Sequence, residues 1–508
     1  MTDKQRQQAI EPIVEEGRNC WRIARAREAS VIVDAADYYR IIAGAMRAGE
    51  KRIFIVGWDF DTRIALDPDE EGKGETLGHF FLRLAREKPD RQIDILKWNF
   101  GAYKQLFRPA ALVWLYRWWR TKTIDFRLDG SHPPGCSHHQ KIVVIDDHLA
   151  ACGGIDISTA RWDTSDHLDD DPHRKGPGGK PYRPWHDATM LLRGPAATAL
   201  AELGRERWKV VTRQDLDPVE AIETAWPERL PAMFENVDIA IARTRAAYDD
   251  LAEVREIEAL TLDLIAAAKR FIYFENQYFT SAKIAAAIAK RMAEPDPPEI
   301  ILVMPRTADG WLEQKAMDGT RIKLVAEIGK SDKGGRFRVY IPVTKSGADI
   351  YVHAKIAIVD DRLLRVGSAN LNNRSQGLDS ECDVIIDTAL AANRDAGEAI
   401  TALRHRLIAE HLDCEPAEVA TAEKKAGGST VDAIDALRGA GKTLELLDME
   451  ELGAAEEFIA SHELLDPERP EDLFEPIDSP GLAQSWAKGR AIIGRKLARR
   501  RGRRRKAG

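Results

Sequence analysis

Short apolar runs alternate with amphipathic segments along this chain of 508 residues. In the first half, buried β-strands are predicted at 52–58, 92–98, 123–128 and 142–145. Helices are predicted within 4–48, around 77–84 and at 109–120. Strands that alternate with helices indicate an α/β architecture.

The second half repeats this order of elements. Its predicted strands are 270–275, 299–304, 336–341 and 356–359. A short motif precedes the last strand of each half, reading His139-x-Lys141-x4-Asp146 and His353-x-Lys355-x4-Asp360. The two histidines are 353 − 139 = 214 residues apart, and the earlier strands pair at roughly similar offsets.

The repeat predicts two fused, internally duplicated α/β/α sandwich half-domains with the active site at their interface. Neither half would be complete alone. The expected half-domains are residues 1–235 and 236–410, each with one copy of the motif. An irregular, partly helical acidic extension is expected at 411–487, followed by a basic tail at 488–508.

The motif residues suggest chemistry on a phosphate. In an extended chain, residues two apart point to the same side, so each copy offers an imidazole beside an ammonium group. The imidazole can act as nucleophile or acid, while the lysine neutralises phosphate oxygens. One copy would carry little weight, but two copies with the same spacing and small-residue turns after them are a strong signal.

Composition narrows the setting. Hydrophobic residues make up 44% of the chain, as in ordinary globular proteins. Five cysteines without CxxC spacing predict a reducing compartment, and we interpret Cys136 as a small buried residue in preference to a reactive thiol. The polar N-terminus and the lack of an apolar run of about 18 residues predict a cytoplasmic protein.

Charge is unevenly distributed. The net charge is −7, but the tail 488–508 carries 11 Lys and Arg residues and no acid, which leaves −7 − 11 = −18 on the rest. The tail could be a solvated end, a contact for anionic lipid or a nucleic-acid contact. Segment 109–120, with three tryptophans, is either a membrane-inserting helix or, as we favour, a packed helix.

Further motifs place the chain beside a known family. They are His138-His139-Gln140-Lys141, Gly153-Gly154-Ile155-Asp156, Arg161-Trp162-Asp163, Pro184-Trp185-His186-Asp187, Glu275-Asn276-Gln277-Tyr278-Phe279, Gly367-Ser368-Ala369-Asn370-Leu371-Asn372-Asn373-Arg374-Ser375 and Asp379-Ser380-Glu381. With these motifs in family order over roughly residues 50–400, the chain resembles the phospholipase D superfamily. The resemblance is to its eukaryotic-type, phosphatidylcholine-hydrolysing branch.

The resemblance implies a two-step phosphoryl transfer that needs no metal and no other cofactor. His139 would attack phosphorus to give a phosphohistidine, and His353 would act as the acid and then the base. Lys141 and Lys355 would supply positive charge, and Asn370 would donate a hydrogen bond to a phosphate oxygen.

The remaining candidate residues have supporting roles. Each imidazole needs a carboxylate on its other nitrogen, and the family match suggests Glu381 for His353 and Asp187 for His139. Ser368 would support Asn370. The residue at the place of Asn370 in the first half is Asp156, and Asp146 and Asp360 are expected to form turns or ion pairs.

Two histidine-rich stretches raise the hypothesis of a metal site. The first comprises His132, His138, His139 and His148, and the second comprises His167, Asp169, Asp170, Asp171 and His173. The neighbouring lysines would repel a cation from the first, and Pro- and Gly-rich surroundings predict a solvated loop for the second. No metal is expected, and His138 and His186 are interpreted as hydrogen-bonding support.

Four tryptophans are candidates for an acyl or headgroup pocket, although each is also a normal core residue. They are Trp58, Trp98, Trp162 and Trp185.

The resulting hypothesis is a monomeric phospholipase D that forms phosphatidic acid from phosphatidylcholine-like lipids, with transphosphatidylation as a side activity. Its tail would bind anionic membrane from the cytoplasmic side. The alternatives are a cardiolipin-synthase-type phosphatidyltransferase, a nuclease of the same superfamily, for which nucleic acid would be the partner, and a non-catalytic membrane-binding protein.

Overall fold

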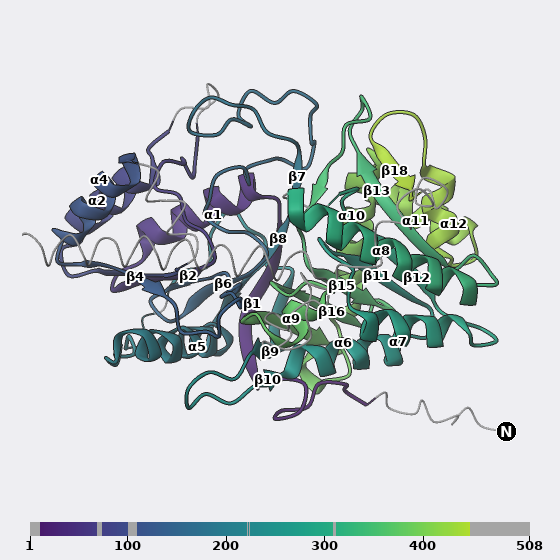
Figure 1. The fold of residues 1–508 in the computed structure, drawn as a ribbon, viewed down its shortest axis with the longest axis horizontal. Helices are drawn as coiled ribbons and strands as arrows, with labels where there is room; N and C mark the ends of the chain where they lie inside the picture. Colours follow the sequence, from purple (N-terminus) through teal and green to yellow (C-terminus); the bar gives the residue numbers. More distant parts are fainter. Residues whose placement is uncertain are drawn as a thin grey trace, which may run out of the picture.

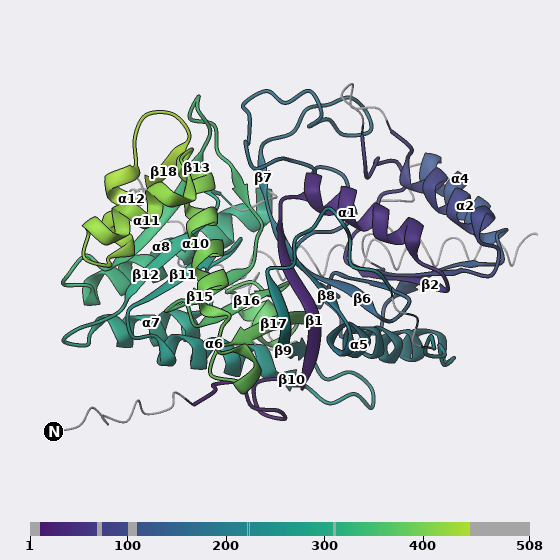
Figure 2. The same ribbon diagram turned by 180° about the vertical axis from the view of Figure 1, so that it is seen from behind.

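The computed structural model describes residues 11–68, 74–99, 109–220, 222, 224–307 and 311–447. One mixed β-sheet runs through both halves of this part of the chain, and helices cover both of its faces (Figure 1). In Figure 1 the first half lies on the left, with α1, α2 and α4 above the strands and α5 below them. The same layers are seen from behind in Figure 2.

The first half contains eight strands and four helices within the described residues. The strands are β1 (Arg22–Val33), β2 (Arg52–Gly57), β3 (Gln92–Trp98), β4 (Ile124–Asp129), β5 (Ile142–Ile145), β6 (Leu149–Gly153), β7 (Trp185–His186) and β8 (Ala188–Arg193). The helices are α1 (Ala35–Ala48), α2 (Leu77–Glu87), α4 (Pro109–Trp119) and α5 (Pro195–Thr212).

The second half has a matching set of elements. Its strands are β9 (Phe234–Arg245), β10 (Val254–Arg255), β11 (Phe271–Glu275), β12 (Glu299–Val303), β13 (Phe337–Val343), β14 (Tyr351–Val352), β15 (Ile356–Val359), β16 (Leu363–Gly367) and β17 (Glu381–Asp387). Its helices are α6 (Glu256–Ala267), α7 (Ala282–Met292), α8 (Trp311–Ser331), α9 (Asn373–Gly377), the short 3₁₀ helix η1 (Ala391–Asn393) and α10 (Gly397–Leu412).

The order of strands confirms the predicted duplication. Outward from the middle of the sheet, the first half runs β1-β8-β6-β5-β2-β3-β4 and the second runs β9-β17-β16-β15-β11-β12-β13. Strands β1 and β9 pair antiparallel at the centre, with Arg22 opposite Ile241 and Ala29 opposite Phe234. The two halves therefore share one continuous sheet, and the boundary expected at residue 235 falls at the start of β9.

Three apolar clusters hold the helices on the sheet. One packs α1 and α2 against the first half, and another packs α6, α7 and α8 against the second. The central cluster contains residues of both α5 and α10, including Leu200, Trp208, Leu403 and Leu407. Because this cluster crosses from one half to the other, burial of apolar surface favours the fused state of the halves.

The prediction of helix throughout 4–48 is wrong for residues 22–33, which form the long strand β1. Arg22, Arg25 and Glu28 recur every three residues and so imitate a polar helix face. In the sheet these residues lie near the open end of β1, where Arg25 forms an ion pair with Asp238 of β9 at 2.7 Å. Pairing on both sides of β1 overrides the local helical pattern.

Helix α4 is packed on one side and exposed on the other. Trp118 is fully buried beside Phe60 and Phe81, whereas Trp119 is 79% exposed and Tyr116 is 56% exposed. Among the described residues, none of the helices is long and apolar enough to cross a membrane.

The start of the C-terminal extension folds onto the second half. Helices α11 (Pro416–Lys425) and α12 (Thr430–Leu437) are followed by β18 (Thr443–Leu446), which pairs antiparallel with β13 at the sheet edge. The rest of the expected acidic extension, from residue 448, and the basic tail 488–508 lie outside the described residues.

The aspartates that end the two motifs hold equivalent turns. The Asp146 carboxylate accepts hydrogen bonds from the backbone N–H groups of Glu50, Lys51 and Arg52 at 2.7–2.8 Å. Asp360 accepts from three backbone N–H groups at the start of β11 in the same way, at 2.7–2.9 Å. Each carboxylate thus anchors the strand that lies next to the motif strand.

The Asp146→Asn substitution should lower the free energy of unfolding by about 1–3 kcal/mol, because charge-assisted hydrogen bonds to three buried or half-buried amides are weakened. Asp90→Asn, at an exposed turn, is the matched control and should change stability little. Denaturant titration of both variants measures the difference. Equal stability of the two would contradict the anchoring role.

Candidate active site

The two motif histidines sit in extended segments directly before β5 and β15. The N–H of His139 donates to the carbonyl of Ser380 at 2.8 Å, next to a bridge between His138 and Ser380. The N–H of His353 donates to the carbonyl of His186 at 2.7 Å, next to the parallel pair β7–β14. Each histidine is therefore fixed by a backbone contact with the opposite half.

These contacts bring each imidazole onto a carboxylate of the other half. His139 Nδ1 lies 3.0 Å from both Glu381 oxygens, and His353 Nδ1 lies 2.7 Å from Asp187 Oδ2. The sequence-based pairing of Glu381 with His353 and of Asp187 with His139 is therefore wrong, and the partners are exchanged. In both cases Nδ1 faces the carboxylate, which leaves Nε2 for chemistry.

The exchange follows from the duplicated topology. Asp187 directly precedes β8 and Glu381 opens β17, and these strands hold equivalent places in the two halves. Strands β8 and β17 flank the central pair β1–β9, so the residues at their ends face the opposite half. A carboxylate at either position thus meets the histidine of the other repeat.

Glycine at position 154 makes this close approach possible. A Cβ atom at Gly154 would lie 2.1 Å from Asp187 Oδ1 and 3.2 Å from the carbonyl oxygen of His353. The first distance is far below the van der Waals contact distance of carbon and oxygen, and the second is near its lower limit. A residue without a side chain is therefore needed at position 154, beside the Asp187 carboxylate that contacts His353.

The two lysines have similar positions but different partners. The Nζ atoms of Lys141 and Lys355 donate to the carbonyls of His139 and His353, respectively. Lys141 also lies 3.3 Å from Asp156 Oδ2.

Lys355 contacts an uncharged side chain at the equivalent place. Its Nζ donates to Gln277 Oε1 at 3.1 Å, and Asn370 Nδ2 lies 3.4 Å from the same oxygen. The ion pair of Lys141 with Asp156 thus has an amide counterpart in the second half. Within the described residues, Lys355 lacks a direct carboxylate contact like that of Lys141, and burial lowers its pKa to about 7 against the opposing charge of Asp187.

The ionisation of both histidines is shifted toward the neutral form. Burial lowers the pKa of His139 well below its usual value, and Lys141 and Lys355 lower it further. Burial likewise lowers the pKa of His353, together with Lys355, Arg161 and Lys141. Since each histidine responds to both lysines, the two motifs form one electrostatic site.

Buried carboxylates complete the site. Burial raises the pKa of Glu381 to about 8, against the opposing effects of Lys141 and of hydrogen bonds from Ser368 and Ser375. Ser368 Oγ donates to Glu381 Oε2 at 2.5 Å and Ser375 Oγ donates to Oε1 at 2.6 Å. Ser368 therefore supports Glu381, the carboxylate that contacts His139. The sequence-based prediction was that Ser368 supports Asn370.

The sequence of this chain is similar to one family model and to several curated proteins. A family model described as cardiolipin synthase, PLD-like domain, matches residues 261–400. Phospholipase D1 of Saccharomyces cerevisiae is 28% identical over 385 residues, which cover 57% of this chain and 23% of that protein. Phospholipase D alpha 1 of Carica papaya is 24% identical over 398 residues, which cover 54% of this chain and 49% of that protein.

Over more than half of its length the chain is therefore similar to proteins named phospholipase D, and its residues 261–400 match a PLD-like domain. It spans about a quarter of the length of the first yeast relative and about half of the papaya protein. A solved phosphatidylserine synthase of Haemophilus influenzae is 13% identical, covers 94% of this chain and 96% of that chain, and superposes with a TM-score of 0.48.

The aromatic candidates differ in their distance from the histidines. The Trp185 ring lies 5.2 Å from the His353 ring, and the Trp58 ring lies 6.2 Å from the His139 ring. Trp98 stacks on Trp58 at 5.7 Å. Trp162 instead packs on the core of the first half, where its ring lies beside the ring of His173.

Sequence reasoning missed several members of the site. Arg161 lies over the Trp185 ring at 4.1 Å and lowers the pKa of His353. Gln277 links Lys355 to Asn370, and Ser375 binds Glu381. Arg161, Gln277 and Ser375 all stand inside motifs that the sequence analysis identified, and that position was the available signal for a role in the site.

The histidine-rich stretches also require a correction. His167 is buried, with 1% of its surface exposed, so the expectation of a solvated loop is wrong there. His138 Nδ1 shares a hydrogen bond with Ser380 Oγ at 2.7 Å, and His138 Nε2 lies 3.0 Å from Asp129 Oδ1. These contacts fit the predicted supporting role of His138. Cys136 is buried and its pKa is raised to about 12 by burial, which fits a small core residue.

A separate cavity of about 440 Å³ lies behind the first motif. His138, Gln140 and Ser380 line it, whereas neither motif lysine and neither motif histidine does. Because side chains alternate along an extended segment, His138 and Gln140 face away from His139 and Lys141. This cavity is therefore distinct from the paired-histidine site.

Double-mutant cycles on unfolding free energy should detect the exchanged pairing. His139→Ala with Glu381→Ala, and His353→Ala with Asp187→Ala, should each show coupling of about 0.5–3 kcal/mol, because each pair is in direct contact. His139→Ala with Asp187→Ala serves as the control and should show a smaller coupling. A larger coupling in the control than in the His139–Glu381 cycle would contradict the pairing.

Proposed function

We propose that this chain is a phospholipase D that cleaves phosphatidylcholine-like glycerophospholipids to phosphatidic acid and the headgroup alcohol. The observation that carries the proposal is the meeting of two carboxylate-bound histidines and two lysines at the junction of the halves. The names of the relatives, several of them called phospholipase D, supply the substrate class.

The proposed reaction has two steps. His139 Nε2 attacks phosphorus while the bond from phosphorus to the headgroup oxygen breaks. That oxygen takes a proton from Nε2 of His353, which takes this proton up from solvent when the phosphate anion binds beside it. Water then attacks the phosphohistidine, gives a proton to His353 and releases His139. An alcohol that replaces water in this step gives a phosphatidyl alcohol.

Charge and access support these roles. Lys141 and Lys355 would balance the phosphate oxygens, so the phosphate needs no metal ion in this mechanism. The lowered pKa of His139 favours the unprotonated nucleophile at neutral pH. His139 is also the more accessible of the pair, with 15% of its side chain exposed against 6% for His353.

The first test uses vesicles of phosphatidylcholine and an anionic lipid with added butanol, with and without EDTA. Wild-type protein should form phosphatidic acid and phosphatidylbutanol, and His139→Asn should form neither. Covalent phosphate should be absent from His139→Asn, whereas His353→Asn should keep slow labelling because its nucleophile remains. Normal labelling of His139→Asn would contradict the assignment of the nucleophile.

The same preparation distinguishes the competing substrates. The match to a family model named for cardiolipin synthase favours phosphatidyl transfer as the second candidate function, so phosphatidylglycerol is offered as an alternative acceptor. Cardiolipin formation in excess of phosphatidic acid would favour that transfer. DNA cleavage without any lipid product would reject the lipid substrate.

We also infer peripheral binding to anionic membrane. The tail 488–508 has 11 basic residues, and basic residues near anionic lipid contribute about 1 kcal/mol each. The exposed aromatic side of α4, with Trp119 and Tyr116, offers a second contact for the headgroup region.

Replacement of the 11 basic tail residues by glutamine should weaken binding to anionic vesicles at least tenfold at low salt, because the tail charge is removed and its length is kept. Binding to purely zwitterionic vesicles should change little. Vesicle co-sedimentation measures both. Unchanged binding to anionic vesicles would reject the role of the tail.

A further inference from the structure

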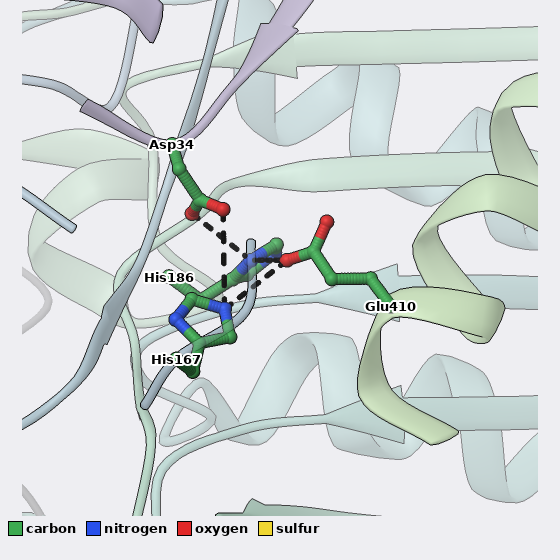
Figure 3. Close-up of side chains that lie close together, drawn as sticks. All are labelled: Asp34, His167, His186 and Glu410. Carbon is green, nitrogen blue, oxygen red and sulfur yellow. Dashed lines mark hydrogen bonds and ion pairs between the residues drawn. The ribbon is translucent and has the colours of Figure 1, made fainter. Parts of the chain in front are cut away.

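A second cluster of histidines and carboxylates lies behind the catalytic pair, and we call it the four-donor cluster. Its members are Asp34, His167, His186 and Glu410. Figure 3 shows the four side chains converging, with Glu410 reaching in from α10 and Asp34 from the end of β1. All four side chains are at most 4% exposed.

One ligand atom from each member meets the others in a small volume. His186 Nδ1 lies 2.8 Å from Glu410 Oε1 and 3.3 Å from Asp34 Oδ1. His167 Nε2 lies 3.1 Å from Glu410 Oε1 and 3.9 Å from Asp34 Oδ2. Tetrahedral zinc with bonds of about 2.0–2.2 Å has ligand-to-ligand edges of about 3.3–3.5 Å, in the middle of this range.

The far nitrogen of each histidine is already held by another carboxylate. His167 Nδ1 lies 2.9 Å from Asp163 Oδ2, and His186 Nε2 lies 2.7 Å from Glu275 Oε2. Histidines that bind metals usually donate their second ring N–H in this way, which fixes the tautomer and directs the other nitrogen at the metal. Both histidines of the cluster meet this requirement.

One atom that points into the cluster lacks a hydrogen bond within the described part of the chain. It is His186 Nδ1, which is fully buried. His186 Nδ1 lies close to two carboxylate oxygens, but the direction of the contact does not give a hydrogen bond. A buried nitrogen near oxygens without hydrogen-bond geometry is expected of a ligand whose lone pair faces a cation.

The charge of the cluster also calls for cations. Two neutral histidines with two carboxylates carry a charge of −2, which one divalent ion balances. Two protons, one on each imidazole, are the competing way to reach neutrality.

We propose that the four-donor cluster binds one structural zinc-class divalent ion. Two imidazoles and two carboxylates complete a tetrahedral shell from protein atoms, as in structural zinc sites. The ion would join β1, the loop before β7 and helix α10, and so link the first half to the second. His186 is adjacent to Asp187, so the ion would also hold the segment that orients His353.

Metal analysis of the purified full-length protein tests the proposal. Wild-type protein incubated with equimolar zinc chloride and then desalted should retain about one zinc ion per chain. His167→Gln and Glu410→Gln should each retain less than about a tenth of that amount. His405→Gln is the matched control, since His405 lies on the same helix and pairs with Glu423 at 2.8 Å outside the cluster; it should retain zinc.

Thermal unfolding of the wild-type protein, with and without zinc, tests the proposal even if a variant folds poorly. Removal of zinc from the wild type with a strong chelator should lower its midpoint of thermal unfolding, and zinc should restore it. Wild-type protein that binds no zinc and shows no such shift would overturn the proposal and leave protons in the cluster. His411 lies outside the four-donor cluster and contacts Glu275 Oε1 at 3.0 Å. Loss of zinc from His411→Gln together with its retention in His167→Gln would overturn the ligand assignment.

Discussion

Each motif histidine depends on a carboxylate from the opposite half of the chain. His139 is held by Glu381 and His353 by Asp187, and in both cases a backbone contact with the same segment fixes the approach. The sheet that joins the halves through β1 and β9 is therefore a condition for chemistry as well as for stability. Separation of the halves would remove both tautomer-fixing carboxylates at once.

The two copies of the motif have diverged within this symmetric frame. Lys141 is compensated by Asp156, whereas Lys355 meets the amide oxygen of Gln277. This asymmetry gives the two chemically identical histidines different surroundings, as an attacking group and a proton donor require.

Local patterns predicted much of the fold and the two motifs that meet at the junction of the halves. Buried strands such as 142–145 were found because continuous apolar runs mark them, and the equal motif spacing revealed the duplication. Strand β1 was missed because charged residues imitate a helix face. The exchanged carboxylates and the four-donor cluster were missed because their members, such as Asp34 and Glu410, meet only through the topology of the sheet.

The most direct test of the paired site is nitrogen NMR of the protein labelled with ¹⁵N in histidine. At pH 7 both His139 and His353 should carry their proton on Nδ1 and have an unprotonated Nε2. Glu381→Ala should alter the signals of His139 and leave those of His353 largely unchanged. Protons on Nε2 of both rings, or a response confined to His353, would contradict the account of carboxylates exchanged between the halves.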